Sequence, residues 1–362
     1  MYKKKDKFKT IGKEMKLKNI CIDDIEDIYH FESFKNTGKK SSKTLIKKGV
    51  STNKSNVSLK KGLVIEIMSN YNYLVSFFHE NNISPKLCIL SGRLKYLTFE
   101  TRNPICVGDY VNVDTTDPEN MRIEEILNRK NILSRYIHPN EVLLAANIDQ
   151  VVIMSSVSEP DFNANLIDRY ICAAEIADIN VVLCINKIDL LEADELPDSK
   201  LSIGDYYKSV GYKVIYTSAS SGYGIEELKD ILLNKITLFS GLSGTGKSSI
   251  INSLEPTLNL KTGDISHFHN KGTHTTTSSV MIPWSFGGYL IDTPGIKTLG
   301  LKPMDVEYLA KCFPGFSKYS QTCGFANCIH IHEENCVVKD QLGKEIPELR
   351  YKSYVNLRSN LC

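Results

Sequence analysis

The sequence predicts a three-part α/β fold: a phosphate-loop domain in the middle, a small all-β barrel before it and a helical module with a metal site after it. Three observations support this prediction. Near-continuous apolar strands alternate with helical segments between about residues 136 and 300, as a parallel sheet covered on both faces requires. Within this region a glycine-rich turn joins a strand to a helix. Beyond it, three cysteines and one histidine lie within fourteen residues.

The length and composition of the chain suit two or three ordinary globular domains. It has 362 residues, of which 42% are hydrophobic and 24% are charged. No stretch approaches eighteen consecutive apolar residues and the first residues contain no apolar leader, so we expect neither a membrane span nor a secretory signal. Ten cysteines in such a chain indicate a reducing compartment, where thiols stay free or bind metal, and therefore a cytoplasmic protein.

Residues 1–60 form a basic extension. They hold 16 lysines against 7 acidic residues, which leaves 28 basic against 35 acidic residues for the rest of the chain. We expect a flexible arm, either a solvated tail or a segment that adds salt-dependent, non-specific affinity for RNA. A transit peptide for an organelle is a third interpretation. The acidic patch at 23–27 and the absence of arginine before Arg93 weigh against it.

Residues 61–135 contain five short, half-apolar segments separated by turn residues. The expected strands are 62–67, 73–77, 86–90, 110–113 and 122–126. Five strands in about seventy residues predict a small closed barrel of the OB-fold type, a fold that commonly binds nucleic acid on one face. The candidate contacts are Tyr71, Tyr73, Arg93, Lys95 and Tyr96, although an ordinary structural role is the simpler interpretation of each one alone.

Residues 136–302 are the predicted α/β domain. Its strands are expected at 150–154, 181–185, 213–216, 236–239 and 289–291. Between the first two, apolar residues recur at helical spacing, so an amphipathic helix there should bury Leu166, Tyr170, Ile171, Ala174 and Ala177.

The glycine-rich turn fits the pattern G-x-x-x-x-G-K-[ST] of a phosphate-binding loop. Its glycines allow backbone N–H groups to surround phosphate oxygens, and the helix that begins near Lys247 directs its positive end toward them. Lys247 would contact the β- and γ-phosphates, and the Ser248 hydroxyl would bind Mg²⁺. The predicted phosphate-contacting residues are Gly241, Leu242, Ser243, Gly244, Thr245, Gly246, Lys247, Ser248 and Ser249.

A second motif indicates that the nucleotide is GTP or GDP. The sequence Asn-Lys-Ile-Asp at 186–189 follows an apolar strand. Asp189 can accept from both N1–H and the 2-amino group of guanine, whereas adenine would leave the carboxylate unpaired. The backbone of a turn at Ser218 would donate to guanine O6. The predicted base-contacting residues are Asn186, Lys187, Ile188, Asp189, Ser218 and Ala219.

Two further segments carry the expected nucleotide switches. Asp292 and Gly295 belong to the motif Asp-Thr-Pro-Gly after the last strand, where Asp292 would hold Mg²⁺ through water and the Gly295 N–H would face the γ-phosphate. The hydroxyl-rich loop at 271–277 would close on the metal through Thr275 or Thr276; simple turn chemistry is the alternative.

The order of these motifs is unusual. In ordinary GTPases the phosphate loop comes first and the base-reading motif last, but here Asp189 precedes Gly241 by 52 residues. A circularly permuted domain explains this order. The segment after Asp292 then leads directly into the C-terminal part, so we expect nucleotide state to be reported there.

The C-terminal cluster has the spacing Cys323-x₄-Cys328-x-His330-x₅-Cys336. Three thiols and an imidazole complete a closed tetrahedral set, which predicts one structural Zn²⁺. His332 and Cys312 are substitutes if one of these ligands is misassigned. The remaining cysteines are expected in cores or tails.

Taken together and in this order, the motifs resemble the ribosome small-subunit-dependent GTPase A family, RsgA or YjeQ, over roughly residues 61–355. The resemblance implies a monomeric, non-membrane GTPase with GTP or GDP, Mg²⁺ and one Zn²⁺. Its implied partner is the small ribosomal subunit late in assembly, which stimulates hydrolysis and whose rRNA contacts both flanking domains. The predicted regions are the extension 1–60, which departs from the family pattern, the OB-fold 61–135, the permuted GTPase domain 136–302 and the zinc module 303–362.

The catalytic assignment includes a departure from ordinary GTPases. Ile296 stands where Ras-like proteins carry a water-orienting glutamine. In the resembling family a histidine of the first switch is proposed for this task, which singles out His274; the alternative is a loop histidine without chemistry. The predicted catalytic residues are His274, Lys247, Thr275 and Thr276. A second departure is Ser220, where many GTPases have lysine.

Two other functions stay open on the residues alone. One is an RNA-binding module in which the nucleotide is only a structural ligand, because Ile296 cannot polarise water. The other is a phosphate-loop kinase or ATPase, which competition between ATP and GTP would identify.

Overall fold

The computed structural model describes residues 58–68, 71–77, 84–97, 104–137, 140–191, 200–260, 279–292, 301 and 303–361. The basic extension, the loop with His274, Thr275 and Thr276, and the predicted switch residue Gly295 lie outside these ranges. The chain divides into two units, Met1–Ser55 and Asn56–Cys362, and all described residues belong to the second one.

The five barrel strands are confirmed. They are β1 (Leu59–Ile67), β2 (Asn72–Phe77), β3 (Lys86–Leu90), β4 (Tyr110–Asp114) and β5 (Arg122–Ile126), with the short helix α3 (Gly92–Leu97) after β3. Their order is β1-β2-β3-β5-β4, and β4 pairs again with β1, so the barrel closes. Only β3 and β5 run parallel among these pairs. This topology is consistent with an OB-fold.

One candidate RNA contact in the barrel was wrong. Tyr73 is fully buried in the barrel core with Val64, Val75 and Val111, so it cannot stack on a base at the surface. Tyr71 is exposed, and the Lys95 ammonium lies 5.6 Å from the centre of its ring.

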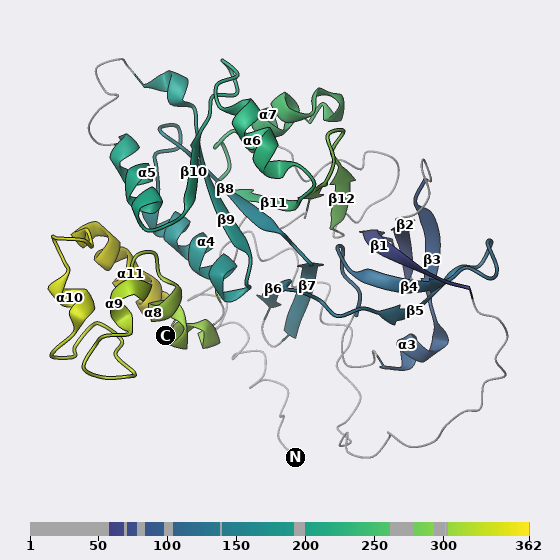
Figure 1. The fold of residues 1–362 in the computed structure, drawn as a ribbon, viewed down its shortest axis with the longest axis horizontal. Coiled ribbons are helices and arrows are strands. Elements are labelled where there is room, and N and C mark those ends of the chain that lie inside the picture. The colour runs from purple at the N-terminus through teal and green to yellow at the C-terminus, as the bar shows by residue number, and fades with distance from the viewer. Residues whose placement is uncertain are drawn as a thin grey trace, which may run out of the picture. The chain divides into compact units, whose positions relative to one another are not determined.

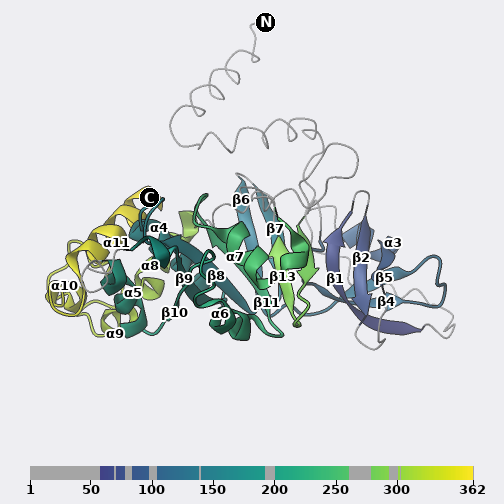
Figure 2. The same cartoon turned by 90° about the horizontal axis from the view of Figure 1, so that it is seen from above.

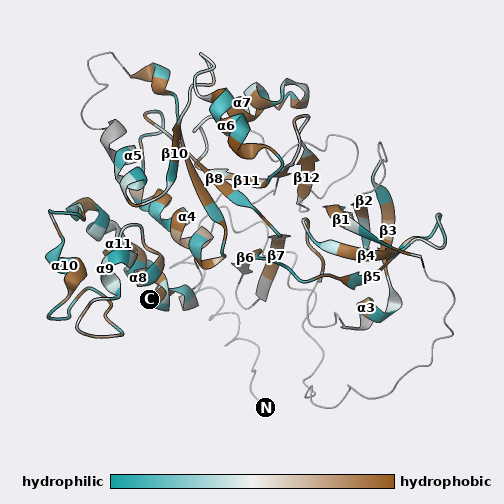
Figure 3. Ribbon diagram, viewed as in Figure 1, coloured by the Kyte–Doolittle hydropathy of each residue, from teal (hydrophilic) through white to brown (hydrophobic). Residues whose placement is uncertain are grey.

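The predicted parallel sheet is also confirmed. Its strands are β8 (Gln150–Ser156), β9 (Asn180–Asn186), β10 (Lys213–Tyr216), β11 (Ile236–Gly241) and β13 (Tyr289–Asp292), in the order β10-β9-β8-β11-β13. The sequence did not predict one antiparallel strand, β12 (Val280–Pro283). In the sheet, β12 lies between β13 and β1 of the barrel, and it pairs with β1 at Val280 and Glu66. Figure 1 shows this sheet, and Figure 3 shows how apolar its central strands are.

Side-chain alternation divides the core between the two faces of this sheet. Val151 and Ile153 of β8 face the helices α4 (Ala164–Ile176) and α5 (Lys200–Ser209). Val152 and Met154 face α6 (Ile225–Leu232) and α7 (Lys247–Leu254), which follows the phosphate loop. Helix α4 begins where the Asn163 side chain accepts from the Leu166 N–H at 3.2 Å, which is ordinary N-capping.

A hairpin between the barrel and the sheet was not predicted. Its strands are β6 (Ile132–Ile137) and β7 (Asn140–Ala146), and they span the expected boundary at residue 135. Residue 107 of the barrel forms an isolated bridge with Ala145, and a Cβ on Gly108 would lie 2.0 Å from the carbonyl oxygen of Ala146. The barrel and the end of β7 are therefore in direct contact.

The C-terminal part consists of short helices and one longer one. They are α8 (Leu309–Cys312), α9 (Ser317–Ser320), α10 (Val337–Asp340), α11 (Glu348–Leu361) and the 3₁₀ turn η7 (Pro303–Glu307). Phe313, Phe316 and Tyr354 belong to the same apolar cluster as Ile171 of α4. As Figures 1 and 2 show, α8 and α11 lie against α4. Among the described residues, every helix is too short or too polar to cross a lipid bilayer.

Candidate functional site

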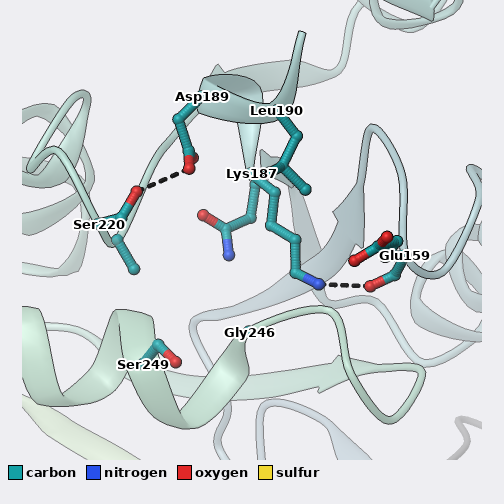
Figure 4. A pocket seen from close by; sticks show the side chains of 9 residues that line it. Glu159, Lys187, Asp189, Leu190, Ser220, Gly246 and Ser249 are labelled. Atoms are coloured by element: carbon teal, nitrogen blue, oxygen red, sulfur yellow. Dashed lines mark hydrogen bonds between the residues drawn. The ribbon is translucent and has the colours of Figure 1, made fainter.

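The two motifs that lie far apart in the sequence meet in one pocket. Its volume is about 430 Å³, within the range of small-molecule sites. Figure 4 shows that the base-reading segment and the start of α7 form opposite sides of it. The lining residues are Glu159, Asn186, Lys187, Asp189, Leu190, Ala219, Ser220, Gly246 and Ser249.

Strand register brings these segments together. Strand β8 lies between β9 and β11, and all three run parallel. Ser156 pairs with Asn186 at the end of β9, and Met154 pairs with Gly241 at the end of β11. Both motifs therefore leave the same carboxyl edge of the sheet, the usual ligand-binding edge of such folds.

The glycines of the phosphate loop are required by its backbone. Gly241, Gly244 and Gly246 all have positive φ, at 145°, 83° and 86°. A Cβ on Gly241 would lie 2.3 Å from the Met154 carbonyl oxygen, and one on Gly246 would lie 2.2 Å from the Asn186 amide nitrogen. No other residue fits these two positions without displacing its neighbours.

Lys247 lies over its own loop. Its ammonium donates to the carbonyl oxygens of Gly241 at 2.8 Å and Leu242 at 2.6 Å. The Thr245 hydroxyl also donates to the Leu242 carbonyl, at 2.9 Å. Ser248 is buried at the first turn of α7, whereas Ser243 and Gly244 are exposed at the tip of the loop. The loop is thus folded as a preformed ring of backbone groups.

Asn186 joins the two halves of the pocket. It is 1% exposed, its amide donates to the Thr245 carbonyl at 3.0 Å, and its oxygen accepts from the Thr217 hydroxyl at 3.2 Å. Both ends of this buried amide are satisfied, so its orientation is fixed. Its role in the structure is to hold the base-reading loop to the phosphate loop.

Lys187 and the loop after β8 form the third wall. Lys187 has a left-handed backbone with φ 65°, and its ammonium donates to the Glu159 carbonyl oxygen. Glu159 and Leu190 line the pocket but belong to no motif, so sequence reasoning missed them. Ile188 was expected beside the base; it lies in the 3₁₀ turn η3 (Ile188–Leu190) and packs against the apolar core, not on the pocket.

Asp189 presents an exposed carboxylate to the pocket. The Ser220 hydroxyl donates to its Oδ2 at 2.7 Å, as Figure 4 shows. The Ser218 and Ser220 hydroxyls, of which Ser220 donates directly to the carboxylate, hold the pKa of Asp189 below its ordinary value. The group is therefore ionised and ready to accept hydrogen bonds at neutral pH.

The magnesium site is described only in part. Ser248 lies at the predicted position, and Asp292 ends β13, whose backbone pairs with β12. The expected switch residues Thr275, Thr276 and Gly295 lie outside the described residues.

The predicted metal ligands form one cluster. The ligand atoms of Cys323, Cys328, His330 and Cys336 all lie within 4.8 Å of one another. His330 Nδ1 is 3.6 Å from the Cys323 sulfur and 3.4 Å from the Cys336 sulfur. A tetrahedral Zn²⁺ with bonds of about 2.3 Å would need ligand separations of roughly 3.5–3.8 Å, so this donor set fits the ion. The substitutes His332 and Cys312 lie outside the cluster.

Glu333 shapes the loop that carries these ligands. Its carboxylate accepts from the backbone N–H groups of Ile329 at 2.6 Å, Ile331 at 3.0 Å and His332 at 3.1 Å. Burial acts to raise the pKa of Glu333, but these donors outweigh it and lower the pKa to about 2. From α11, the Tyr351 hydroxyl adds a bond to the His330 carbonyl at 2.8 Å.

Comparison with known sequences finds close relatives. The family model described as RsgA GTPase matches residues 126–302. A protein of Flavobacterium psychrophilum named small ribosomal subunit biogenesis GTPase RsgA is 39% identical over 281 residues, covering 75% of this chain and 85% of its own length. A Thermotoga maritima protein of the same name is 34% identical, with 82% of this chain and 95% of its own covered.

Two solved structures have folds similar to that of this chain. The crystal structure of YjeQ from Thermotoga maritima superimposes with a TM-score of 0.69 at 33% identity, covering 84% of this chain and 99% of that one. YloQ, described as a circularly permuted GTPase, superimposes with a TM-score of 0.67 at 27% identity, covering 86% and 98%. The permuted motif order inferred from the sequence therefore has a solved counterpart in YloQ.

Proposed function

The chain belongs to the RsgA GTPase family, and from this premise we propose that it hydrolyses GTP to GDP and phosphate during biogenesis of the small ribosomal subunit. The observation that carries the proposal is the single pocket between Asp189 and the phosphate loop. Its two ends offer a carboxylate for guanine and a ring of backbone groups for phosphates.

The described residues divide the work of nucleotide binding. Asp189 pairs with the two donors of guanine, and Ala219 of the Ser218–Ala219 turn would face guanine O6, because the Ser218 N–H is already bonded to the Tyr223 carbonyl. The phosphate loop and the start of α7 surround the phosphates, which Lys247 contacts. Ser248 would bind Mg²⁺, and Asp292 with Thr275 or Thr276 would complete the proposed set; the ion would neutralise phosphate charge.

The catalytic proposal depends on a group other than glutamine to order water. His274 is the proposed residue, because Ile296 stands at the usual position of the glutamine and cannot hydrogen-bond. Lys247 stabilises the charge that develops on the transferred phosphate. The Gly295 N–H would hold the second switch to the γ-phosphate and release it after hydrolysis.

The flanking regions provide the proposed partner contacts. Cys323, Cys328, His330 and Cys336 would hold one structural Zn²⁺. The barrel would contact rRNA through exposed groups such as Tyr71 and Lys95. The relatives' name refers to the small ribosomal subunit, and we propose that subunit as the partner of this chain. We also propose a cytoplasmic monomer with regions 1–60, 61–135, 136–302 and 303–362.

The test is the rate of GTP hydrolysis against the concentration of purified small subunits. We expect at least a tenfold rise that saturates, and no rise with large subunits. Lys247→Ala should lower the stimulated rate by roughly a hundredfold or more, because it removes a charge that acts on the transition state. A flat response, or GTP bound but not hydrolysed on the subunit, would reject the proposal. Efficient competition by ATP would indicate a kinase or ATPase instead.

A further inference from the structure

Two serines of the turn after β10 form a chain of hydrogen bonds that ends on Asp189. The Ser220 hydroxyl donates to Asp189 Oδ2 at 2.7 Å, and the Ser218 and Ser220 hydroxyl oxygens lie 3.0 Å apart. An ionised carboxylate can only accept, so the proton of Ser220 is used on Asp189. Ser220 must then accept from Ser218. The direction of this hydroxyl relay, from Ser218 through Ser220 to Asp189, is therefore fixed.

The relay is anchored at its inner end. Ser218 is fully buried, its N–H donates to the Tyr223 carbonyl at 3.0 Å, and its carbonyl accepts from the Gly222 N–H at 2.9 Å. Asp189, at the outer end, is exposed. An exposed carboxylate rotates readily about its last bond, because that torsion has a broad energy profile. A donor fixed to the buried turn restricts this rotation.

We propose that Ser220 is a positioning residue for guanine recognition: the hydroxyl relay fixes the plane of the Asp189 carboxylate so that each oxygen meets one of the two guanine donors. The inference rests on the proposed function, in which Asp189 reads the base. A carboxylate oxygen has two lone pairs, so Oδ2 accepts from Ser220 and from the base at the same time. Fixing the carboxylate before binding reduces the ordering cost that would otherwise reduce affinity.

This role replaces the one that lysine has at this position in many GTPases. A lysine stem would cover part of the base, whereas the short Ser220 side chain contacts Asp189 and Ser218. Hydroxyl chains of this kind strengthen one another, since each donor is polarised by the next acceptor. The specificity of the pocket for a second base donor should therefore depend on Ser220.

The experiment measures dissociation constants of the full-length protein for GTP and for ITP, which lacks the 2-amino group. We expect Ser220→Ala to weaken GTP about five- to tenfold and ITP only about twofold, because a loose carboxylate loses mainly the second contact. Ser220→Thr retains the hydroxyl and should restore the wild-type ratio. Ser221→Ala removes a neighbouring exposed hydroxyl outside the relay and should leave both constants unchanged.

The outcomes separate the inference from the function on which it rests. Equal weakening of GTP and ITP by Ser220→Ala would show a merely structural role and overturn the inference, as would two unchanged dissociation constants. If the wild-type protein itself binds GTP no better than ITP or ATP, the proposed recognition of guanine by Asp189 is rejected, whatever the Ser220 variants show. Thermal unfolding of each variant, followed by circular dichroism, confirms that the comparisons are between folded proteins.

Discussion

At the scale of single residues, two side chains of the Asn-Lys-Ile-Asp motif lie in different surroundings. Asp189 faces the pocket as an acceptor, whereas Asn186, three residues earlier, is buried and bonded to the phosphate loop. On the proposed function the motif has two tasks: Asp189 would recognise the base, and Asn186 would set the distance between base and phosphates by holding the two loops together.

A substitution of Asp189 should change which nucleotide base the protein prefers. Asp189→Asn replaces one acceptor by a donor, which suits xanthine, whose 2-position carries an oxygen. We expect GTP affinity to fall by at least a hundredfold and XTP to become the preferred nucleotide, measured by competition against a labelled guanine nucleotide. The control is Asp205→Asn on α5, an exposed carboxylate outside the pocket. Retained preference for GTP would place the base elsewhere.

The sequence predicted Asp189, Lys247 and the loop glycines of the site, but not the residues that complete the walls of the pocket. Asp189, Lys247 and the loop glycines have chemistry that restricts their spacing, so a pattern reveals them. Glu159 and Leu190 reach the pocket because of how the loop after β8 turns and where β9 ends. Nothing in their residue types indicates this, because it depends on tertiary packing.

At the scale of elements, a buried ion pair attaches α11 to α4. Arg350 lies 2.9 Å from Asp168, the side chains are 3% and 0% exposed, and the Tyr207 hydroxyl of α5 donates to Asp168 as well. Burial raises the pKa of Asp168 even though Arg350 opposes this. The pair thus joins the C-terminal part to two helices of the GTPase domain.

Removing Arg350 from this ion pair should lower the stability of the folded protein. Arg350→Ala leaves the Asp168 carboxylate buried without its partner, and we expect a loss of about 3–5 kcal/mol in the free energy of unfolding. Urea unfolding followed by the single tryptophan, Trp284, measures it. Lys352→Ala, an exposed residue of the same helix, is the control and should cost less than about 0.5 kcal/mol. An equal effect of both substitutions would mean that the Arg350–Asp168 pair does not contribute to the free energy of unfolding.

Removing the metal tests a second element. We expect a chelator, or Cys328→Ser, to unfold the loop between Cys323 and Cys336, because its fold depends on four converging ligands. Subunit binding should weaken at least tenfold, while the dissociation constant for GTP changes less than about twofold. Metal content and both affinities are measured on the same sample. An equal loss of GTP binding would show that the metal loop supports the nucleotide pocket.

The strands that sequence reasoning missed share a physical cause. β12 has four residues and β6 begins a hairpin next to a domain boundary, so neither shows a long alternating pattern. Both form because of pairing: β12 with β13 and β6 with β7. The long apolar strands β8, β9 and β11 were predictable because burial on both faces requires apolar residues throughout.

At the scale of the whole molecule, the two cores explain why nucleotide and metal sites should respond separately. The phosphate-loop helix α7 rests on one face of the sheet with Ile250 and Ile251. The C-terminal part packs on the other face, where Phe313 and Tyr354 meet α4. Damage to the C-terminal part therefore leaves the packing beneath the phosphate loop intact, which is why GTP affinity should survive loss of the metal.

The pairing between β1 and β12 has a mechanical consequence. Because β1 belongs to the barrel and β12 to the GTPase sheet, hydrogen-bonded strands continue from β10 to β4 without interruption. A load applied to the barrel by a bound macromolecule would therefore reach the GTPase sheet through the Glu66–Val280 pair as well as through the contacts of Val107 and Gly108 with β7. Val280→Pro would disrupt the pairing of β12 with β1, so we expect the rate of GTP hydrolysis to respond less to a macromolecule bound to the barrel.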